Sequence, residues 1–146
     1  MNLSNVVYDF CSELVDKGGV FEDVMLHADT YEPIKPGKTI RVDEVIESTP
    51  RSVRRQGVLI MRETNAHLDV QVVVTPDSEK LDDRKAARNS ADELTLALTL
   101  EIEKREQGEI GDCVRVSRIR KSNRWYNVAN RKTPVAFLRL FINEGI

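Results

Sequence analysis

The chain has 146 residues, of which 40% are hydrophobic and 32% charged, and its formal net charge is −2. This length suits one domain with one core, so the sequence predicts a single domain over residues 1–146 that needs no disulfides. No basic segment followed by an apolar core opens the chain, and no stretch approaches the ~18 apolar residues of a membrane span, which favours a soluble protein of the cytoplasm.

The first predicted element is an amphipathic helix that Asn2 or Ser4 can cap and that Gly18 and Gly19 end. Its apolar residues recur at the three-and-four spacing of one buried face, and Cys113 in a later strand is expected to be buried as well. The residues of the apolar stripe are Leu3, Val6, Val7, Phe10, Cys11 and Leu14. A core position is favoured for both cysteines over a metal or redox role.

The next segments change period. Residues 20–29 have no clean period, which leaves a short strand and a helical turn both open. Residues 30–38 contain two prolines and a glycine and predict an irregular surface loop. From residue 39 a period of two predicts a strand with Ile40, Val42 and Ile46 on one face.

A long exposed hairpin loop is predicted for residues 48–56, which are polar and contain Pro50. Two strands follow at residues 58–63 and 68–75, and residues 64–67 are expected to form the turn between them. Three antiparallel strands with one apolar face require a layer of helix to cover that face.

A second helix is predicted over residues 90–105 and supplies this layer. Ser90 and Glu93 stand in the spacing of a capping box, immediately before the apolar series of Leu94, Leu98 and Ile102. The polar residues 77–89 before it fit either a linker or one or two additional helical turns. The predicted fold class is therefore α+β, an antiparallel β-sheet packed by an N-terminal helix and a second helix between strands.

The last third predicts two strands joined by a basic, aromatic connection. Val114 and Val116 share one face, and the change of parity at Ile119 indicates a bulge or a strand that leaves the sheet. The final strand is apolar on both faces, with Ala136, Leu138, Leu140 and Ile142 on one and Val135, Phe137, Arg139 and Phe141 on the other. One face belongs to the core, and the other requires a helix or a neighbouring subunit.

Charge is strongly polarised along the chain. Residues 1–32 carry seven acidic residues and one lysine, a balance of −6, whereas residues 113–146 carry eight basic residues and one glutamate, a balance of +7. Opposite patches can fix the register of an interface between copies, or they can neutralise each other within one monomer.

Enzymatic chemistry finds little support in the residues. Asp77, Asp83 and Lys85 faintly resemble the carboxylate and lysine set of metal-dependent nucleases, but they fall in one polar run rather than on adjacent strands. His27 and His67 are isolated from other ligands in the sequence. We therefore expect a non-enzymatic protein with no catalytic residue, no metal and no cofactor.

Two binding interpretations share the basic aromatic run. Arginines beside exposed aromatic rings can neutralise phosphates and stack on bases, so a nucleic-acid-binding module is the alternative function. Trp, Tyr and Arg also anchor protein interfaces. The candidate interface residues are Arg51, Arg54 and Arg55 of the predicted loop, and Arg118, Arg120, Arg124, Trp125, Tyr126 and Arg131; the nucleic-acid interpretation adds Lys121 and Lys132.

The order of these elements resembles the tail terminator, or tail-completion, proteins of tailed bacteriophages. The likeness covers nearly the whole chain in layout and is strongest at residues 114–119, 125–130 and 135–142. The resemblance implies a structural virion protein whose hexameric ring caps the tail tube and joins it to the head or neck. No catalytic residues come with it.

The same resemblance implies the partners and the location of the protein. They are further copies of the chain, a tail tube protein and a neck or connector protein, with no membrane and only incidental contact with passing DNA. The protein would lie in the host cytoplasm during assembly and afterwards in the tail or neck of the virion. On this interpretation, the acidic and basic ends are the two patches of a heterologous interface.

Overall fold

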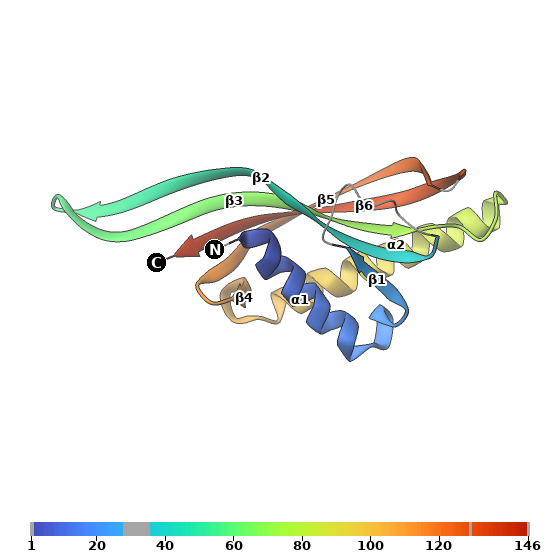
Figure 1. Cartoon of the computed structure of the whole chain (residues 1–146), viewed down its shortest axis with the longest axis horizontal. Helices are drawn as coiled ribbons and strands as arrows, with labels where there is room; N and C mark the ends of the chain where they lie inside the picture. The colour runs from blue at the N-terminus through green and yellow to red at the C-terminus, as the bar shows by residue number, and fades with distance from the viewer. Residues whose placement is uncertain (1, 28–35, 129, 146) are drawn as a thin grey trace.

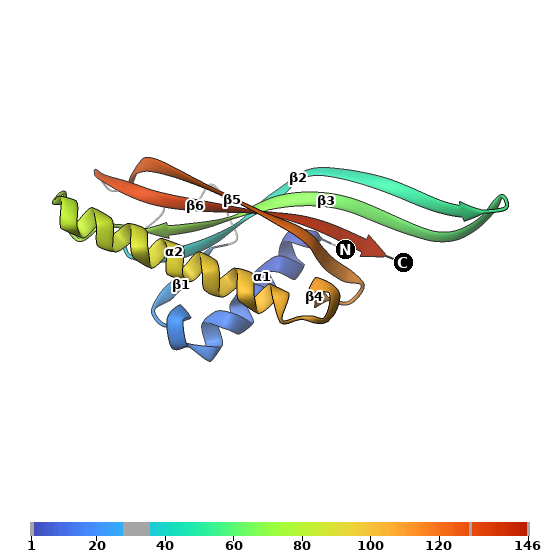
Figure 2. The same cartoon turned by 180° about the vertical axis from the view of Figure 1, so that it is seen from behind.

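The computed structural model describes residues 2–27, 36–128 and 130–145, and it has the predicted α+β fold (Figure 1). Within these ranges six strands form one sheet in the order β1-β2-β3-β6-β5-β4, and of the strand pairs described there only β1–β2 is parallel. Both helices lie on the same side of this sheet (Figure 2). The predicted fold class is confirmed.

The strands are longer than the sequence pattern indicated. Two of them form a hairpin that crosses the body and leaves it at one end (Figure 1). The elements are α1 (Leu3–Lys17), β1 (Val24–His27), β2 (Lys38–Arg55), β3 (Val58–Val74), α2 (Leu81–Glu103), β4 (Glu109–Gly111), β5 (Val114–Val128) and β6 (Arg131–Gly145), with 3-10 turns at Gly19–Phe21 and Glu106–Gly108.

Helix α1 follows its prediction closely. The side chain of Asn2 caps the helix by accepting a hydrogen bond of 2.9 Å from the Ser4 amide. Gly18, with φ of 75°, ends it. The predicted stripe is buried except for Val6, which is partly exposed. Residues 20–27 satisfy both open interpretations, because a 3-10 turn is followed by the short strand β1. Residues 30–35 of the predicted loop lie outside the described residues.

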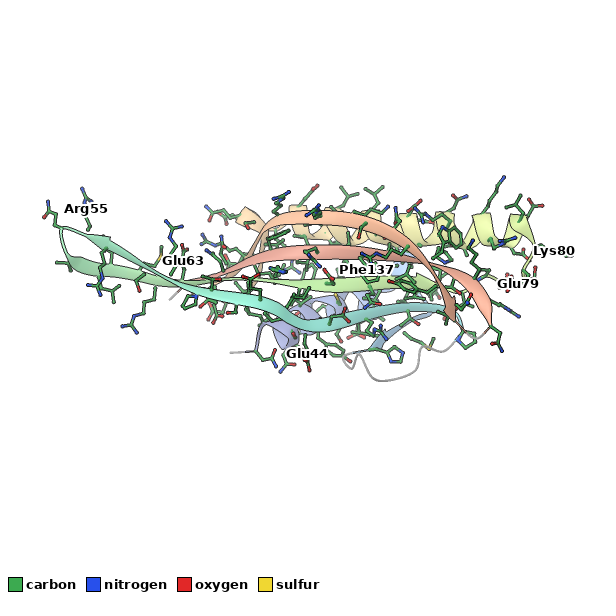
Figure 3. The ribbon with its side chains drawn as sticks, turned by 90° about the horizontal axis from the view of Figure 1, so that it is seen from above. Glu44, Arg55, Glu63, Glu79, Lys80 and Phe137 are labelled. Atoms are coloured by element: carbon green, nitrogen blue, oxygen red, sulfur yellow. The ribbon has the colours of Figure 1, made fainter. Side chains whose placement is uncertain are left out.

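The core lies between the helices and one face of the sheet. Alternate residues of β3 and β6 point into it, and Leu68, Val70 and Leu138 are each at most 1% exposed. Helix α2 packs on β3 and β6, while α1 packs on β2 and β4. We call the sheet surface on the opposite side from both helices the outer face (Figure 3).

The predicted loop at residues 48–56 and the predicted turn at 64–67 are both wrong. Strand β2 continues to Arg55, and β3 runs without interruption from Val58 to Val74. Pro50 is compatible with the strand because β1 pairs with β2 only as far as Arg41, so the proline lies on a free edge where no amide is needed.

The predicted start of α2 at Ser90 is wrong, and the alternative of additional helical turns before it is confirmed. The helix begins at Leu81, so Ser90 lies inside it and no capping box forms. The N-cap residue is Lys80, and just before it the Ser78 hydroxyl donates a hydrogen bond to Asp83 and accepts one from the Lys80 amide. The apolar period reveals only the half of the helix that carries the large core side chains. The earlier half is mostly polar and buries only the small side chains of Ala87 and Ala91.

Irregularities in the strands explain two further differences. Ile46, predicted to be in the core, is 52% exposed because the β2–β3 register shifts on both sides of Val45. Cys113 is exposed and has a φ of 58° in the turn before β5, so its predicted burial is wrong. The bulge predicted near Ile119 is confirmed as a register shift between Val116 and Arg118.

The basic aromatic connection predicted between the last two strands is instead strand. Strand β5 extends to Val128 and β6 begins at Arg131, so the two form a second long hairpin. None of the helices among the described residues is long and apolar enough to cross a bilayer.

The two thiols should react very differently in the folded protein. Burial raises the pKa of Cys11 to about 12, whereas Cys113 is exposed. We expect a thiol reagent at pH 8 to modify one cysteine per chain, and a second only after unfolding in denaturant. A Cys113→Ser variant should show no fast-reacting thiol, and rapid modification of that variant would contradict the buried position of Cys11.

Candidate interaction surfaces

The first candidate surface is the end of the β2–β3 hairpin, residues 48–62, which we call the arm. Strand β6 accompanies β3 only as far as the Glu63–Gly145 pair, so the arm continues as two strands without a third. Figure 3 shows Arg55 at its far end and Glu63 at its base. Gln56 and Gly57 close it with φ values of 52° and 78°, the positive pair that a tight two-residue hairpin turn requires.

The arm is purely basic in its ionisable groups. It contains four arginines and no acidic residue: Arg51, Arg54, Arg55 and Arg62. Arg51 lies 3.5 Å from the Glu63 carboxylate at the base, and Arg54 donates a 3.3 Å hydrogen bond to the Gly57 carbonyl. Because such exposed contacts contribute little energy, these guanidinium groups remain available to a partner.

The arm also exposes apolar side chains. Val58 is 66% exposed and Ile60 59%, and Leu59 and Met61 are also exposed. Neither helix lies beneath this part of the hairpin (Figures 1 and 2). A two-stranded ribbon is only marginally stable by itself, and an uncovered apolar one invites association.

The second surface is a hollow in the outer face, where three arginines meet one carboxylate. Asp69, Arg139 and Arg120 are direct neighbours across β3, β6 and β5. Arg139 binds Asp69 with two hydrogen bonds of 2.9 and 3.2 Å, which raise the pKa of Arg139. Within the part of the chain that the structure describes, Arg120 has no ion-pair partner. The hollow is lined by Asp69, Arg120, Ser122, Arg124, Phe137 and Arg139.

Aromatic rings lie under two arginines of the outer face. Arg118 is 5.3 Å from the ring centroid of Phe141, and Arg124 is 5.6 Å from that of Phe137. The edge of Tyr126 also packs on Phe137, at 6.1 Å between centroids. The outer side of β6, which was expected to need a helix or another subunit, is therefore partly covered by arginines from β5.

The structure separates the nine residues that the sequence grouped together. Three lie on the arm, and Arg118, Arg120, Arg124 and Tyr126 lie on the outer face. Trp125 points to the opposite side, beside Leu81 and Arg88 of α2. Arg131 donates a 2.7 Å hydrogen bond to the Pro76 carbonyl.

Strand alternation accounts for this division. Neighbouring residues of a strand point to opposite faces, so a basic aromatic run in β5 cannot form one surface. The candidate interface residues from the sequence did not include Arg62, Asp69 or Arg139. Alternation had already placed Arg139 on the same face as Phe137 and Phe141, and this parity was the available signal.

The third surface is acidic and lies on α1 and the turn that follows it. Asp9, Glu13 and Asp16 follow the spacing of one exposed helix face, and Glu22 and Asp23 extend it. Glu13 is 3.7 Å from Arg105, and the other four have no ion-pair partner among the described residues. We call these five residues the acidic surface.

Polar residues elsewhere serve structural roles. Gln71 bridges Arg41 and Asp43 with hydrogen bonds of 3.0 and 2.7 Å, and burial raises the pKa of Asp43. No three His, Cys, Asp or Glu side chains in the described ranges are grouped to hold a metal ion.

Comparison of the chain with models of protein families and with curated proteins found no match.

The row of Asp69, Arg139 and Arg120 predicts a coupling that a double-mutant cycle can measure. Asp69→Asn should lower the free energy of unfolding by about 1 kcal/mol, a small value because the Arg139 side chain is 39% exposed. Without the Asp69 carboxylate, Arg139 and Arg120 are two like charges that face each other across β6 and β5. Adding Arg120→Gln removes their repulsion and should recover part of the lost stability. Strictly additive effects in urea denaturation would show that the row is not coupled.

Proposed function

We propose that this chain is a structural subunit that assembles with copies of itself into a ring, which caps the tail tube of a bacteriophage and joins it to the neck. The observation that carries this proposal is the arm, which projects from the folded body with uncovered apolar side chains and four arginines. An element of this kind is stabilised by a partner rather than by its own domain.

Complementary surfaces favour identical copies as partners. The arm is basic, the acidic surface lies on a different element, and contact between two unlike patches is heterologous. Such contacts repeat from copy to copy and close into a ring when the rotation permits. The resemblance to tail terminators suggests six subunits, a tube protein on one side and a neck protein on the other. The proposal assigns no catalytic residue and no cofactor.

Removing the arm tests this function directly. Residues 52–62 can be replaced by Asn-Gly, which joins the paired residues Arg51 and Glu63 with a tight turn. We expect the wild-type chain to form rings alone or on tail tubes, measured by light scattering and electron microscopy. The shortened chain should stay monomeric with an unchanged helical circular-dichroism signal, because the core residues are untouched. Rings formed by the shortened chain would contradict the role of the arm.

The outer face favours a second candidate, binding of single-stranded nucleic acid. Arg118 and Arg124 are held over aromatic rings, and Arg120 and Arg139 lie between them on an open sheet surface. Guanidinium planes can stack on bases while they neutralise phosphates.

A salt series distinguishes this candidate from the first. If the four arginines neutralise four phosphates, the logarithm of the association constant for labelled single-stranded DNA should fall with a slope of about −3 against the logarithm of salt concentration. Arg120→Gln with Arg124→Gln should make the slope shallower by about 1.4, whereas the matched pair Arg54→Gln with Arg55→Gln should not. Undetectable DNA binding at low salt would eliminate the candidate.

A further inference from the structure

We infer that the arm of one copy binds the acidic surface of α1 on the next copy. The inference rests on the proposed function and assigns the two halves of its subunit contact. It begins from the charges that each surface leaves unpaired.

The arm cannot satisfy its arginines within its own chain. The hairpin leaves the body and extends beyond both helices (Figures 1 and 2). Its only acidic contact among the described residues is Glu63 at the base, so Arg54, Arg55 and Arg62 have no carboxylate partner. These exposed arginines are therefore available to a negatively charged surface of a second molecule.

The acidic surface has the reciprocal deficit. Asp9 and Glu13 are separated by one helical turn, and like charges at this spacing destabilise a helix. Only Glu13 has a basic partner in the described chain, and that contact is long at 3.7 Å. Basic side chains laid along α1 would relieve this repulsion, while the acidic residues relieve the repulsion between arginines of the arm.

The two surfaces also match in length and in apolar content. From Asp9 to Asp16 the helix rises about 10 Å, and from Arg51 to Arg55 a strand advances about 13 Å. Val15 and Val20 are partly buried at the margin of the core, close in sequence to the acidic residues. They offer apolar contact to the uncovered side chains of the arm, such as Ile60.

The outer face is a weaker partner for the acidic surface. Arg139 is already held by Asp69 through two hydrogen bonds, and Arg118 and Arg124 are stacked on rings. The arm combines unpaired arginines, uncovered apolar groups and reach beyond the body, so it is the better match.

Charge reversal tests the contact. The arm variant carries Arg51→Glu, Arg54→Glu and Arg55→Glu, and the helix variant carries Asp9→Arg, Glu13→Arg and Asp16→Arg, so the arm changes from +4 to −2 and the acidic surface from −5 to +1. Each variant alone should lose assembly, with the assembled fraction reduced about tenfold or more because attraction becomes repulsion. All six changed positions are exposed, so both variants should keep the wild-type thermal unfolding profile.

Mixing the two variants gives the most specific result. A reversed arm fits a reversed helix and an unchanged arm fits an unchanged helix, so the mixture should assemble with the two variants alternating around an even-numbered ring. A chain that carries all six substitutions should also assemble by itself. Native mass spectrometry can count equal numbers of the two variants in the mixed ring.

The control places the same charge change on the outer face, as Arg118→Glu, Arg120→Glu and Arg124→Glu, which should leave assembly intact. Normal assembly by the arm and helix variants would overturn the contact and leave the ring function standing. Loss of assembly in the control, with no recovery in the mixture, would assign the acidic surface to the outer face instead. If the wild-type chain assembles neither alone nor on tail tubes, the contact and the proposed function both fall.

Discussion

The ladder between β3 and β6 is the constraint on which the rest of the structure depends. It runs from the Val73–Val135 pair to the Glu63–Gly145 pair at the centre of the sheet. Its register sets Leu68, Val70 and Val72 beside buried residues of β6, so both helices have one continuous apolar face to cover. A slip of one residue would turn this whole face to solvent, which makes the register strongly specified.

The same register creates the polar outer face. Because Leu138 and Leu140 point into the core, Arg139 between them must point outward, where it meets Asp69 on one side and Arg120 on the other. Arginines stacked on Phe137 and Phe141 shield two rings without a covering helix. The outer face therefore presents charged groups to solvent, although the side chains of β6 are largely apolar.

Sequence patterns predicted the parts of the fold that bury a regular apolar stripe. Such a stripe is present in helix α1 and on the buried sides of β3 and β6. In β5, the break in the parity of the apolar residues indicated the bulge. The arm was mistaken for a loop because composition indicates that Pro50 and three arginines are solvent-exposed but cannot distinguish an exposed strand from a loop. The first half of α2 was left undecided for a similar reason, since Ala87 and Ala91 fill its contact with the body without large apolar residues.

The candidate surfaces were only partly predictable, because they depend on which strands pair. Residues 118–126 look like one basic cluster in the sequence, but alternation sends Trp125 to the helix side and Arg124 to the outer face. Asp69 and Arg139 are 70 residues apart and meet only through the β3–β6 register. The polarisation of charge between the two ends of the chain was visible in the sequence. The basic arm at residues 48–62 belongs to neither of these ends, and its projection from the body was not visible.

The direction of the arm has a consequence for assembly that charge alone does not provide. Heterologous contacts close into a ring only when each contact turns the next copy by the correct angle, and otherwise they continue as a filament. Three register shifts interrupt the β2–β3 ladder, two around Val45 and one between Val53 and Arg54. Bulges bend and twist a ribbon, so the two shifts around Val45, just before the arm, set the angle at which the arm leaves the body. On the proposed contact, the bulges near Val45 determine the number of subunits, and the arginines at the tip determine whether the subunits bind at all.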